Sequence, residues 1–99
     1  MIVGYLDDAT RDVHVVHVGT ESRAARRFGE DVRRAARRKL DLIGAAGDIR
    51  DLTVPPGNRL ERLKGDRAGF YSIRVNDQFR ITFRFDGGNA SQVQLVDYH

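Results

Sequence analysis

The sequence predicts an α+β fold, with a small antiparallel sheet and two or three helices packed on one face of it. Three observations lead to this prediction. Apolar and polar residues alternate over residues 71–85, as in half-buried strands. Apolar residues recur at three- and four-residue spacing over residues 30–44, as in an amphipathic helix. The order of elements is one strand, then helices, then four strands, which leaves the second face of the sheet open for function.

Length and composition exclude several classes of protein. The 99 residues fit a single domain, residues 1–99, that can bury one core. The chain has no cysteine and therefore neither a disulfide framework nor a thiolate metal site. No apolar run approaches the roughly 18 residues of a membrane span, and no signal-like segment opens the chain. We therefore expect a cytoplasmic protein without a membrane partner.

The positive charge is unevenly distributed along the chain. The net charge is +3 and the pI is about 9.8, which makes polyanions candidate partners. Residues 22–43 carry eight Arg or Lys against three acidic residues, and most of the remaining basic residues follow residue 58. The charge thus concentrates on one predicted helix and on the strands that follow it.

The first fifth of the chain is the hardest part to interpret. Residues 2–6 are predicted as a short strand. Residues 9–19 are ambiguous, because their β-branched residues favour an extended chain whereas Thr10 can cap a short helix. His14 and His17 can share a helix face as metal ligands, but no Cys or Glu stands at matching spacing. Partly exposed histidines without a metal are the stronger interpretation.

The amphipathic helix over residues 30–44 follows a shorter helix-forming stretch at residues 20–27. One further turn is predicted at residues 49–52, and the prolines of residues 55–57 indicate a rigid loop. The polar face of the long helix carries a row of basic side chains: Arg33, Arg34, Arg37, Arg38 and Lys39. Such a row is either a solvated face or a contact for a nucleic-acid backbone or an acidic partner, and the sequence leaves both open.

The alternation over residues 71–85 predicts a hairpin and also its register. A two-residue turn at Asn76-Asp77 would place apolar residues opposite polar ones. A loop of three or five residues instead keeps each face uniform. The predicted pairs are then Val75 with Phe79, Ile73 with Ile81, Tyr71 with Phe83, Ser72 with Thr82 and Arg74 with Arg80.

The pairing of Arg74 with Arg80 predicts an anion site. Like charges at directly opposite positions destabilise a strand pair by roughly 0.2–1 kcal/mol. Guanidinium groups are always charged and match phosphate geometry, so we expect a phosphate between them. The alternative is a solvated basic face.

Shorter strands are predicted on either side of this hairpin. Residues 59–64 form a basic strand before a turn at residues 65–66, and residues 86–89 are a turn before a last strand at residues 92–97. Strict alternation along that last strand directs Asp97 and His99 toward the core. A role for them in an open site therefore requires the strand end to bend.

Four motifs in the second half of the chain occur in a characteristic order. They are Pro55-Pro56-Gly57-Asn58-Arg59-Leu60-Glu61, Leu63-Lys64-Gly65-Asp66-Arg67, Ser72-Ile73-Arg74-Val75-Asn76-Asp77-Gln78-Phe79-Arg80 and Val96-Asp97-Tyr98-His99. Together they resemble the HigB branch of the RelE superfamily, the toxins of type II toxin–antitoxin modules. The resemblance implies a RelE-like fold, a ribosome-dependent endonuclease that cleaves mRNA in the decoding site without a metal or cofactor, and a helix-turn-helix antitoxin partner, HigA.

The resemblance also assigns roles to residues. Arg74 and Arg80 would stabilise the charge of the transition state, and His99 would be a general acid or base, because histidine titrates near neutral pH. Asp97 would orient a neighbour, and Tyr98 would donate a hydrogen bond or stack on a base. The predicted substrate-binding residues are Lys64, Arg59, Arg84 and Arg67.

Two departures from the family pattern affect the site. Some HigB-like toxins have a histidine just before the Leu-Lys-Gly segment, where this chain has Glu61-Arg62, so that acid–base group is either lost or replaced by Glu61. Tryptophan is common where Phe79 stands. Two other functions are alternatives: a ParE-like protein that inhibits DNA gyrase without catalysis, and a plain basic RNA-binding domain.

Overall fold

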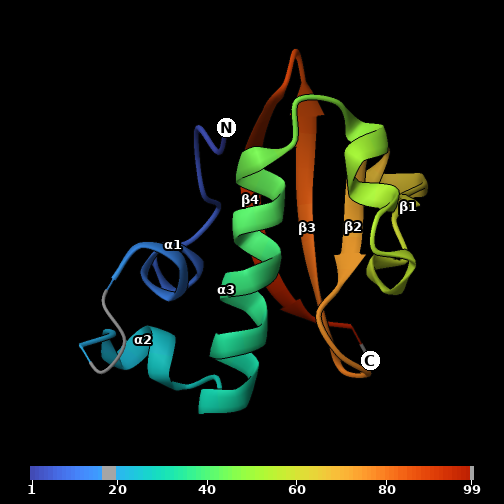
Figure 1. Ribbon diagram of the computed structural model, residues 1–99. Coiled ribbons are helices and arrows are strands. Elements are labelled where there is room, and N and C mark those ends of the chain that lie inside the picture. The colour runs from blue at the N-terminus through green and yellow to red at the C-terminus, as the bar shows by residue number, and fades with distance from the viewer. Residues whose placement is uncertain (17–19, 99) are drawn as a thin grey trace.

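The computed structural model describes residues 1–16 and 20–98, and these residues form the predicted α+β fold (Figure 1). His17 and His99, both named above as candidates, lie outside the described residues. The helices are α1 (Asp8–Val15), α2 (Arg23–Arg26) and α3 (Glu30–Ala45), with 3-10 turns η1 (Ile49–Thr53), η2 (Pro56–Asn58) and η3 (Gly65–Arg67). The strands are β1 (Glu61–Arg62), β2 (Phe70–Arg74), β3 (Phe79–Asp86) and β4 (Asn89–Asp97).

The sheet is antiparallel with the order β1-β2-β3-β4, and its central register is the predicted one. Tyr71 pairs with Phe83, Ser72 with Thr82, Ile73 with Ile81 and Arg74 with Arg80. The loop at residues 76–78 has the predicted odd length, and Val75 N donates to the Phe79 carbonyl beside it. A two-residue turn at Gly87-Gly88, both with positive φ, joins β3 to β4 as expected.

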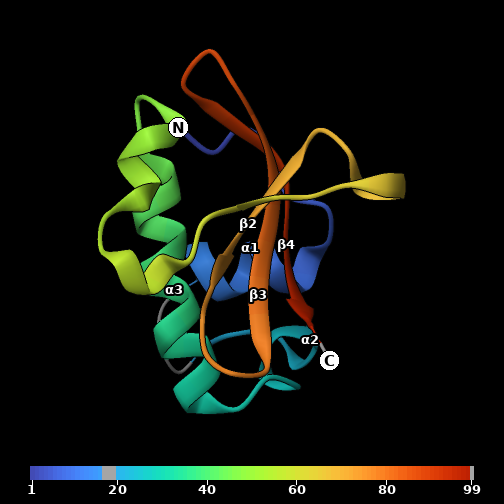
Figure 2. The same ribbon diagram turned by 90° about the vertical axis from the view of Figure 1, so that its right-hand side faces the viewer.

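The core lies between α3 and one face of the sheet. Figures 1 and 2 show α3 running along this face, and α1 beside the β4 edge. Side chains from the two layers are fully buried there: Ala36, Leu40, Ile43, Ile73, Ile81, Phe83 and Val93. Burial of large aliphatic and aromatic side chains contributes about 1.5–3 kcal/mol each, so the alternation that puts them on this face also selects the register.

Three of the expected strands differ from their predicted bounds. Residues 2–6 contribute only two isolated parallel bridges, Ile2 with Ala90 and Tyr5 with Val93, along the outer edge of β4. The basic strand predicted at residues 59–64 is reduced to the two residues of β1. The last strand begins at Asn89, earlier than expected, because the Gly-Gly turn lets pairing start at once.

The ambiguous segment after residue 8 is helical, and its cap is Asp7, not Thr10. Thr10 N donates to the Asp7 carboxylate at 2.8 Å, as in a standard N-cap. The Thr10 hydroxyl is buried and accepts from Leu95 N at 2.9 Å, which ties α1 to the edge of the sheet. The Thr10 hydroxyl thus makes a tertiary contact, which the local sequence pattern cannot predict.

His14 joins three segments through hydrogen bonds. Its ring nitrogens lie 2.6 Å from the Tyr5 hydroxyl and 2.8 Å from the Asp41 carboxylate. Within residues 1–16 and 20–98, no group of three or more potential ligand side chains is arranged to hold a metal ion. No helix of the same residues has both the length and the apolar character needed to cross a membrane.

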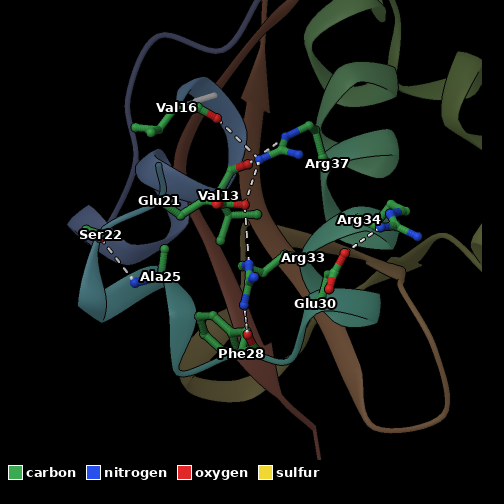
Figure 3. A network of polar contacts seen from close by, with 10 residues as sticks. All are labelled: Val13, Val16, Glu21, Ser22, Ala25, Phe28, Glu30, Arg33, Arg34 and Arg37. Atoms are coloured by element: carbon green, nitrogen blue, oxygen red, sulfur yellow. Dashed lines mark hydrogen bonds and ion pairs between the residues drawn. The ribbon is translucent and has the colours of Figure 1, made fainter. Parts of the chain in front are cut away.

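The sequence left the basic row of α3 open between a solvated face and a contact for a polyanion or acidic partner, and two of its members instead make contacts within the protein. Arg33 Nε donates to the Glu21 carboxylate at 3.3 Å and Arg37 Nη2 to the same group at 3.5 Å, while Arg37 Nε donates to the Val13 carbonyl at 3.0 Å (Figure 3). The Glu21 side chain is only 3% exposed. These arginines therefore hold the α1–α2 segment against α3. Arg34 pairs with Glu30 in the solvent and Arg38 is exposed, whereas Lys39 is half-buried and donates to the Asn58 side chain.

Removing the buried carboxylate should destabilise the fold. We predict that Glu21→Gln lowers the free energy of unfolding by about 3 kcal/mol, because two guanidinium groups lose their counter-charge in a partly buried setting. Glu30→Gln breaks the exposed ion pair between Glu30 and Arg34 on α3. It should lower the free energy of unfolding by less than about 0.5 kcal/mol. Urea unfolding followed by circular dichroism measures both. Equal losses in the two variants would contradict a structural role for Glu21.

Asp7 should make stability depend on pH. Partial burial favours its protonated form, but the hydrogen bonds from Thr10 and Gln94 and the charge of Arg27 outweigh this and lower the pKa of Asp7. The ionised form therefore stabilises the fold at neutral pH, and that contribution is lost as the pH falls through the lowered pKa. Asp7→Asn keeps an oxygen that can cap α1. Its stability deficit should be largest at neutral pH and shrink in acid, whereas a deficit independent of pH in parallel urea titrations would contradict the assignment.

Candidate active site

The face of the sheet turned away from α3 is lined by the residues that alternate with the core. From β2 these are Phe70, Ser72 and Arg74, and from β3 they are Arg84, Thr82 and Arg80, paired in that order. β1 adds Glu61 opposite Ser72. We call this surface the open face, although the sequence prediction that it is open holds only in part, because Ser72, Thr82 and Arg80 at its centre are buried. It brings Arg74 and Arg80 to directly opposite positions, as the sequence predicts.

Arg80 is held rigidly in the middle of the open face. Its Nε donates to the Ser72 hydroxyl at 2.9 Å and its Nη2 to the Arg59 carbonyl at 2.6 Å. The Glu61 carboxylate lies 3.7 Å from the same Nη2. The side chain is only 9% exposed, so the guanidinium is nearly buried. Charge-assisted hydrogen bonds of this kind fix both the position and the plane of the guanidinium.

Arg74 is held differently, so the two arginines are not an equivalent pair. Its Nη2 forms an ion pair with Asp77 in the β2–β3 loop. The Arg74 side chain is 35% exposed and Asp77 almost fully exposed. Like-charge repulsion across the strand pair is thus offset by two separate acceptor sets, and no phosphate is needed for that purpose. The fold therefore does not require an anion between the two guanidinium groups.

The Arg59 segment shows why Arg80 is buried. Arg59 follows η2 in a left-handed conformation with φ of 45°, which turns its carbonyl toward Arg80. The neighbouring Asn58 is fully buried and donates to the carbonyls of Leu52 and Val54, which anchors the turn. Arg59 was predicted to bind substrate through its side chain. Its contact with the site is made by its backbone, while its side chain is exposed.

The last described residues divide between the two faces of the sheet. Tyr98 lies on the open side, with its ring centre 5.4 Å from the Arg80 guanidinium carbon. Asp97 pairs with Phe79, which is on the core side, and accepts from Gln78 Nε2 at 2.9 Å. The bend that would bring Asp97 to the open face is thus not present up to residue 98, and Tyr98 reaches Arg80 through ordinary alternation.

The remaining predicted substrate-binding residues lie at the far end of the open face, except Lys64. Arg67 Nη2 donates to the Thr82 hydroxyl at 3.1 Å, and the guanidinium of Arg67 lies 4.8 Å from the centre of the Phe70 ring. Arg84 lies over the same ring at 5.0 Å. Lys64 precedes η3 and is exposed to solvent. The sequence predicted these residues as substrate-binding cations. It did not predict that two of them would lie against one aromatic ring.

Sequence reasoning missed a cavity at the end of β4. It has a volume of about 460 Å³ and lies between the α2 end and the last residues of the strand. Its lining residues are Arg27, Phe28, Phe79, Gln94, Leu95, Val96 and Asp97. Nothing in the local sequence pattern predicts it, because its walls come from elements about 50 residues or more apart in the chain.

Comparison with known proteins identifies the family. Residues 19–99 match the family described as the RelE-like toxin of the type II toxin–antitoxin system HigB. The chain therefore belongs to the HigB-like toxin family, and the resemblance found in its motifs is confirmed. Helix α1 precedes the matched region.

Relatives and a solved structure agree with this placement. The chain is 47% identical over 58 residues to Toxin HigB-1 of Vibrio cholerae, covering 59% of this chain and 61% of the relative. It is 49% identical over 61 residues to Endoribonuclease HigB of Proteus vulgaris, covering 62% and 65%. These matches span less than two thirds of the relatives' length. The YoeB–YefM complex from Staphylococcus aureus shares the fold, with a TM-score of 0.62 at 17% identity, over 100% of this chain and 95% of the matched one.

The unequal settings of the two arginines can be measured. We predict that Arg80→Met lowers the free energy of unfolding by about 2–3 kcal/mol, because buried charge-assisted hydrogen bonds are lost and their acceptors stay unsatisfied. Arg74→Met breaks only an exposed ion pair and should cost less than about 1 kcal/mol. Thermal and urea unfolding of both variants provide the comparison. Equal losses of unfolding free energy in the two variants would show that the buried setting of Arg80 contributes nothing to stability.

Proposed function

We propose that this protein is the toxin of a type II toxin–antitoxin module and that it cleaves mRNA in the decoding site of the ribosome. The observation that carries the proposal is the rigid Arg80 guanidinium beneath the Tyr98 ring, at the centre of a basic open face. Family membership and the relative named as an endoribonuclease support it. The reaction is attack of a ribose 2′-hydroxyl on the adjacent phosphorus, which gives a 2′,3′-cyclic phosphate and a 5′-hydroxyl.

The residues of the site supply electrostatic stabilisation for this reaction. Negative charge grows on the phosphate oxygens as the 2′-oxygen attacks, and Arg80 offers a fixed positive charge that needs no reorganisation. Arg74, on the paired position, adds a second charge once a phosphate competes with Asp77 for it. Tyr98 has an exposed ring beside Arg80, where it can stack on a base or donate its hydroxyl.

Proton transfer falls to residues at the end of the chain. His99 follows Tyr98 directly and has the side chain best suited to act as general acid or base. Asp97, hydrogen-bonded to Gln78 on the core side of the sheet, would hold the end of β4 in place. Glu61 lies beside Arg80 and is the second candidate base, in the Glu61-Arg62 segment where some HigB-like toxins have a histidine.

The size of the expected rate effects supports the proposed dependence of cleavage on a ribosome. General acid–base help supplies roughly 10²–10⁴ in rate, and one electrostatic donor about 10²–10³. Orientation of the 2′-hydroxyl in line with the scissile bond supplies more than either. A decoding site that holds the message in one geometry provides this orientation, so cleavage of free RNA should be slow.

The partner we propose is a helix-turn-helix antitoxin of the HigA type, acting with the toxin in the cytoplasm and without a cofactor. The family description names a toxin–antitoxin system, and the similar fold from Staphylococcus aureus was solved as a YoeB–YefM complex.

The test uses programmed ribosomes and end-labelled mRNA. We predict codon-dependent cutting that leaves a 5′-hydroxyl and a cyclic phosphate. Arg80→Lys keeps the charge but cannot reproduce the guanidinium hydrogen bonds to the Ser72 hydroxyl and the Arg59 carbonyl. This variant should cut about 10²-fold more slowly. His99→Ala should be similarly impaired. Arg26→Lys, an exposed residue on α2, is the control and should cut at the wild-type rate.

Three results would contradict the proposal. Fragments that carry a 5′-phosphate would show a different reaction. Intact message together with inhibition of gyrase supercoiling would select a ParE-like inhibitor, and intact message with RNA binding alone would select a plain RNA-binding domain.

A further inference from the structure

Two arginines share one aromatic ring at the end of the open face away from Tyr98. The guanidinium carbons of Arg67 and Arg84 lie 4.8 and 5.0 Å from the centre of the Phe70 ring. The two charges are therefore within about 10 Å of each other, roughly one Debye length at 0.1 M salt, and repel each other. We call Arg67, Phe70 and Arg84 the arginine–phenylalanine cluster.

The backbone is built to form this cluster. Gly69 has a φ of +92°, a conformation that favours glycine, and an added Cβ would lie 3.1 Å from Arg84 Nη2. The absent side chain lets the guanidinium lie against the main chain before β2. The hydrogen bond from Arg67 to the Thr82 hydroxyl fixes the second cation to β3. Both positive groups are thus pre-organised.

The cluster differs from the rest of the open face in having no acidic partner. Arg74 pairs with Asp77, and Arg80 lies near Glu61. Among the residues that the structure describes, neither Arg67 nor Arg84 forms an ion pair. Cation–π contact offsets part of the repulsion between the two guanidinium groups but supplies no negative charge. An anion from outside the protein would complete the arrangement.

The position of the cluster relative to Arg80 defines what that anion can be. Arg84 and Arg80 are four residues apart on β3 and face the same side, a separation of about 13 Å along the strand. Thr82 lies between them on the same face and binds Arg67. Because Thr82 and Ser72 are fully buried, an anion that contacts both the cluster and the site around Arg80 must span this distance at the surface, as a chain of phosphates does.

We propose that the arginine–phenylalanine cluster is a second RNA-binding subsite, which holds the phosphates of the single-stranded message beside the segment being cleaved. This inference rests on the proposed function, because it places the scissile phosphate at Arg80. The outer face of the exposed Arg84 guanidinium is available for an unpaired base, while Arg67 and Arg84 together hold the backbone. The cluster contributes to substrate binding and is too far along the strand to act on the reacting atoms.

The first experiment measures binding without cleavage. The probe is a short fluorescein-labelled RNA that is 2′-O-methylated throughout and so cannot be cut, and anisotropy is followed over a salt series. Arg67→Gln and Arg84→Gln should each weaken binding and make the slope of log K against log salt shallower by about 0.7, the loss of one phosphate contact. Arg26→Gln removes the same charge from α2 and should leave the slope close to wild type.

A charge-neutral variant separates the cluster from a general effect of basic charge. Phe70→Leu keeps the net charge and an apolar side chain but removes the ring that positions both guanidiniums. It should weaken binding severalfold, with folding verified by circular dichroism. A fully 2′-O-methylated duplex of the same length should bind more weakly than the single strand, because paired bases cannot stack on Arg84.

The outcomes distinguish this inference from the proposed function. If wild type cuts programmed ribosomes but both arginine variants bind RNA with the salt slope of Arg26→Gln, the subsite is refuted and the nuclease stands. If wild type does not cut while the two variants lose phosphate contacts as predicted, the nuclease is refuted and the RNA subsite stands. In the cleavage assay the variants should raise KM more than they lower kcat. A loss confined to kcat, or tighter binding of the duplex, would overturn the subsite.

Discussion

The pairing register of β2 and β3 is the constraint on which the rest of the structure depends. Packing of Ile73, Ile81 and Phe83 beneath α3 selects it, because a shift of one residue would expose all of them. The same register aligns the opposite set of side chains across the open face. Core packing on one side of the sheet thus places the cations on the other, and no separate interaction is needed to bring them together.

The positive charges of the open face are made compatible with folding in three different ways. Arg80 is enclosed by hydrogen-bond acceptors, Arg74 has a carboxylate from the adjoining loop, and the arginine–phenylalanine cluster uses the face of a ring. These settings differ in how much of the charge remains available to a ligand. The enclosed guanidinium is suited to a fixed electrostatic role, and the exposed ones are suited to binding.

Sequence patterns predicted the hairpin and its register because both follow from a period of two within one short stretch. They did not predict the partners of Arg33 and Arg37, because Glu21 and the Val13 carbonyl lie 12 and 24 residues away in the chain, outside the helix that carries the arginines. The burial of Arg80 was missed for the same reason, since its acceptor belongs to the left-handed Arg59. The family motifs identified the protein's class, yet the division of chain-end side chains between two faces required the structure.

The central claim is that the open face positions a message for attack by its own ribose hydroxyl. The most direct measurement is cleavage of a programmed message that carries one 2′-deoxynucleotide immediately before the cut site. Without that hydroxyl there is no nucleophile, so we predict that the site stays intact while an unmodified message on the same ribosomes is cut. Cutting of the deoxy-substituted message at the same bond would contradict the account.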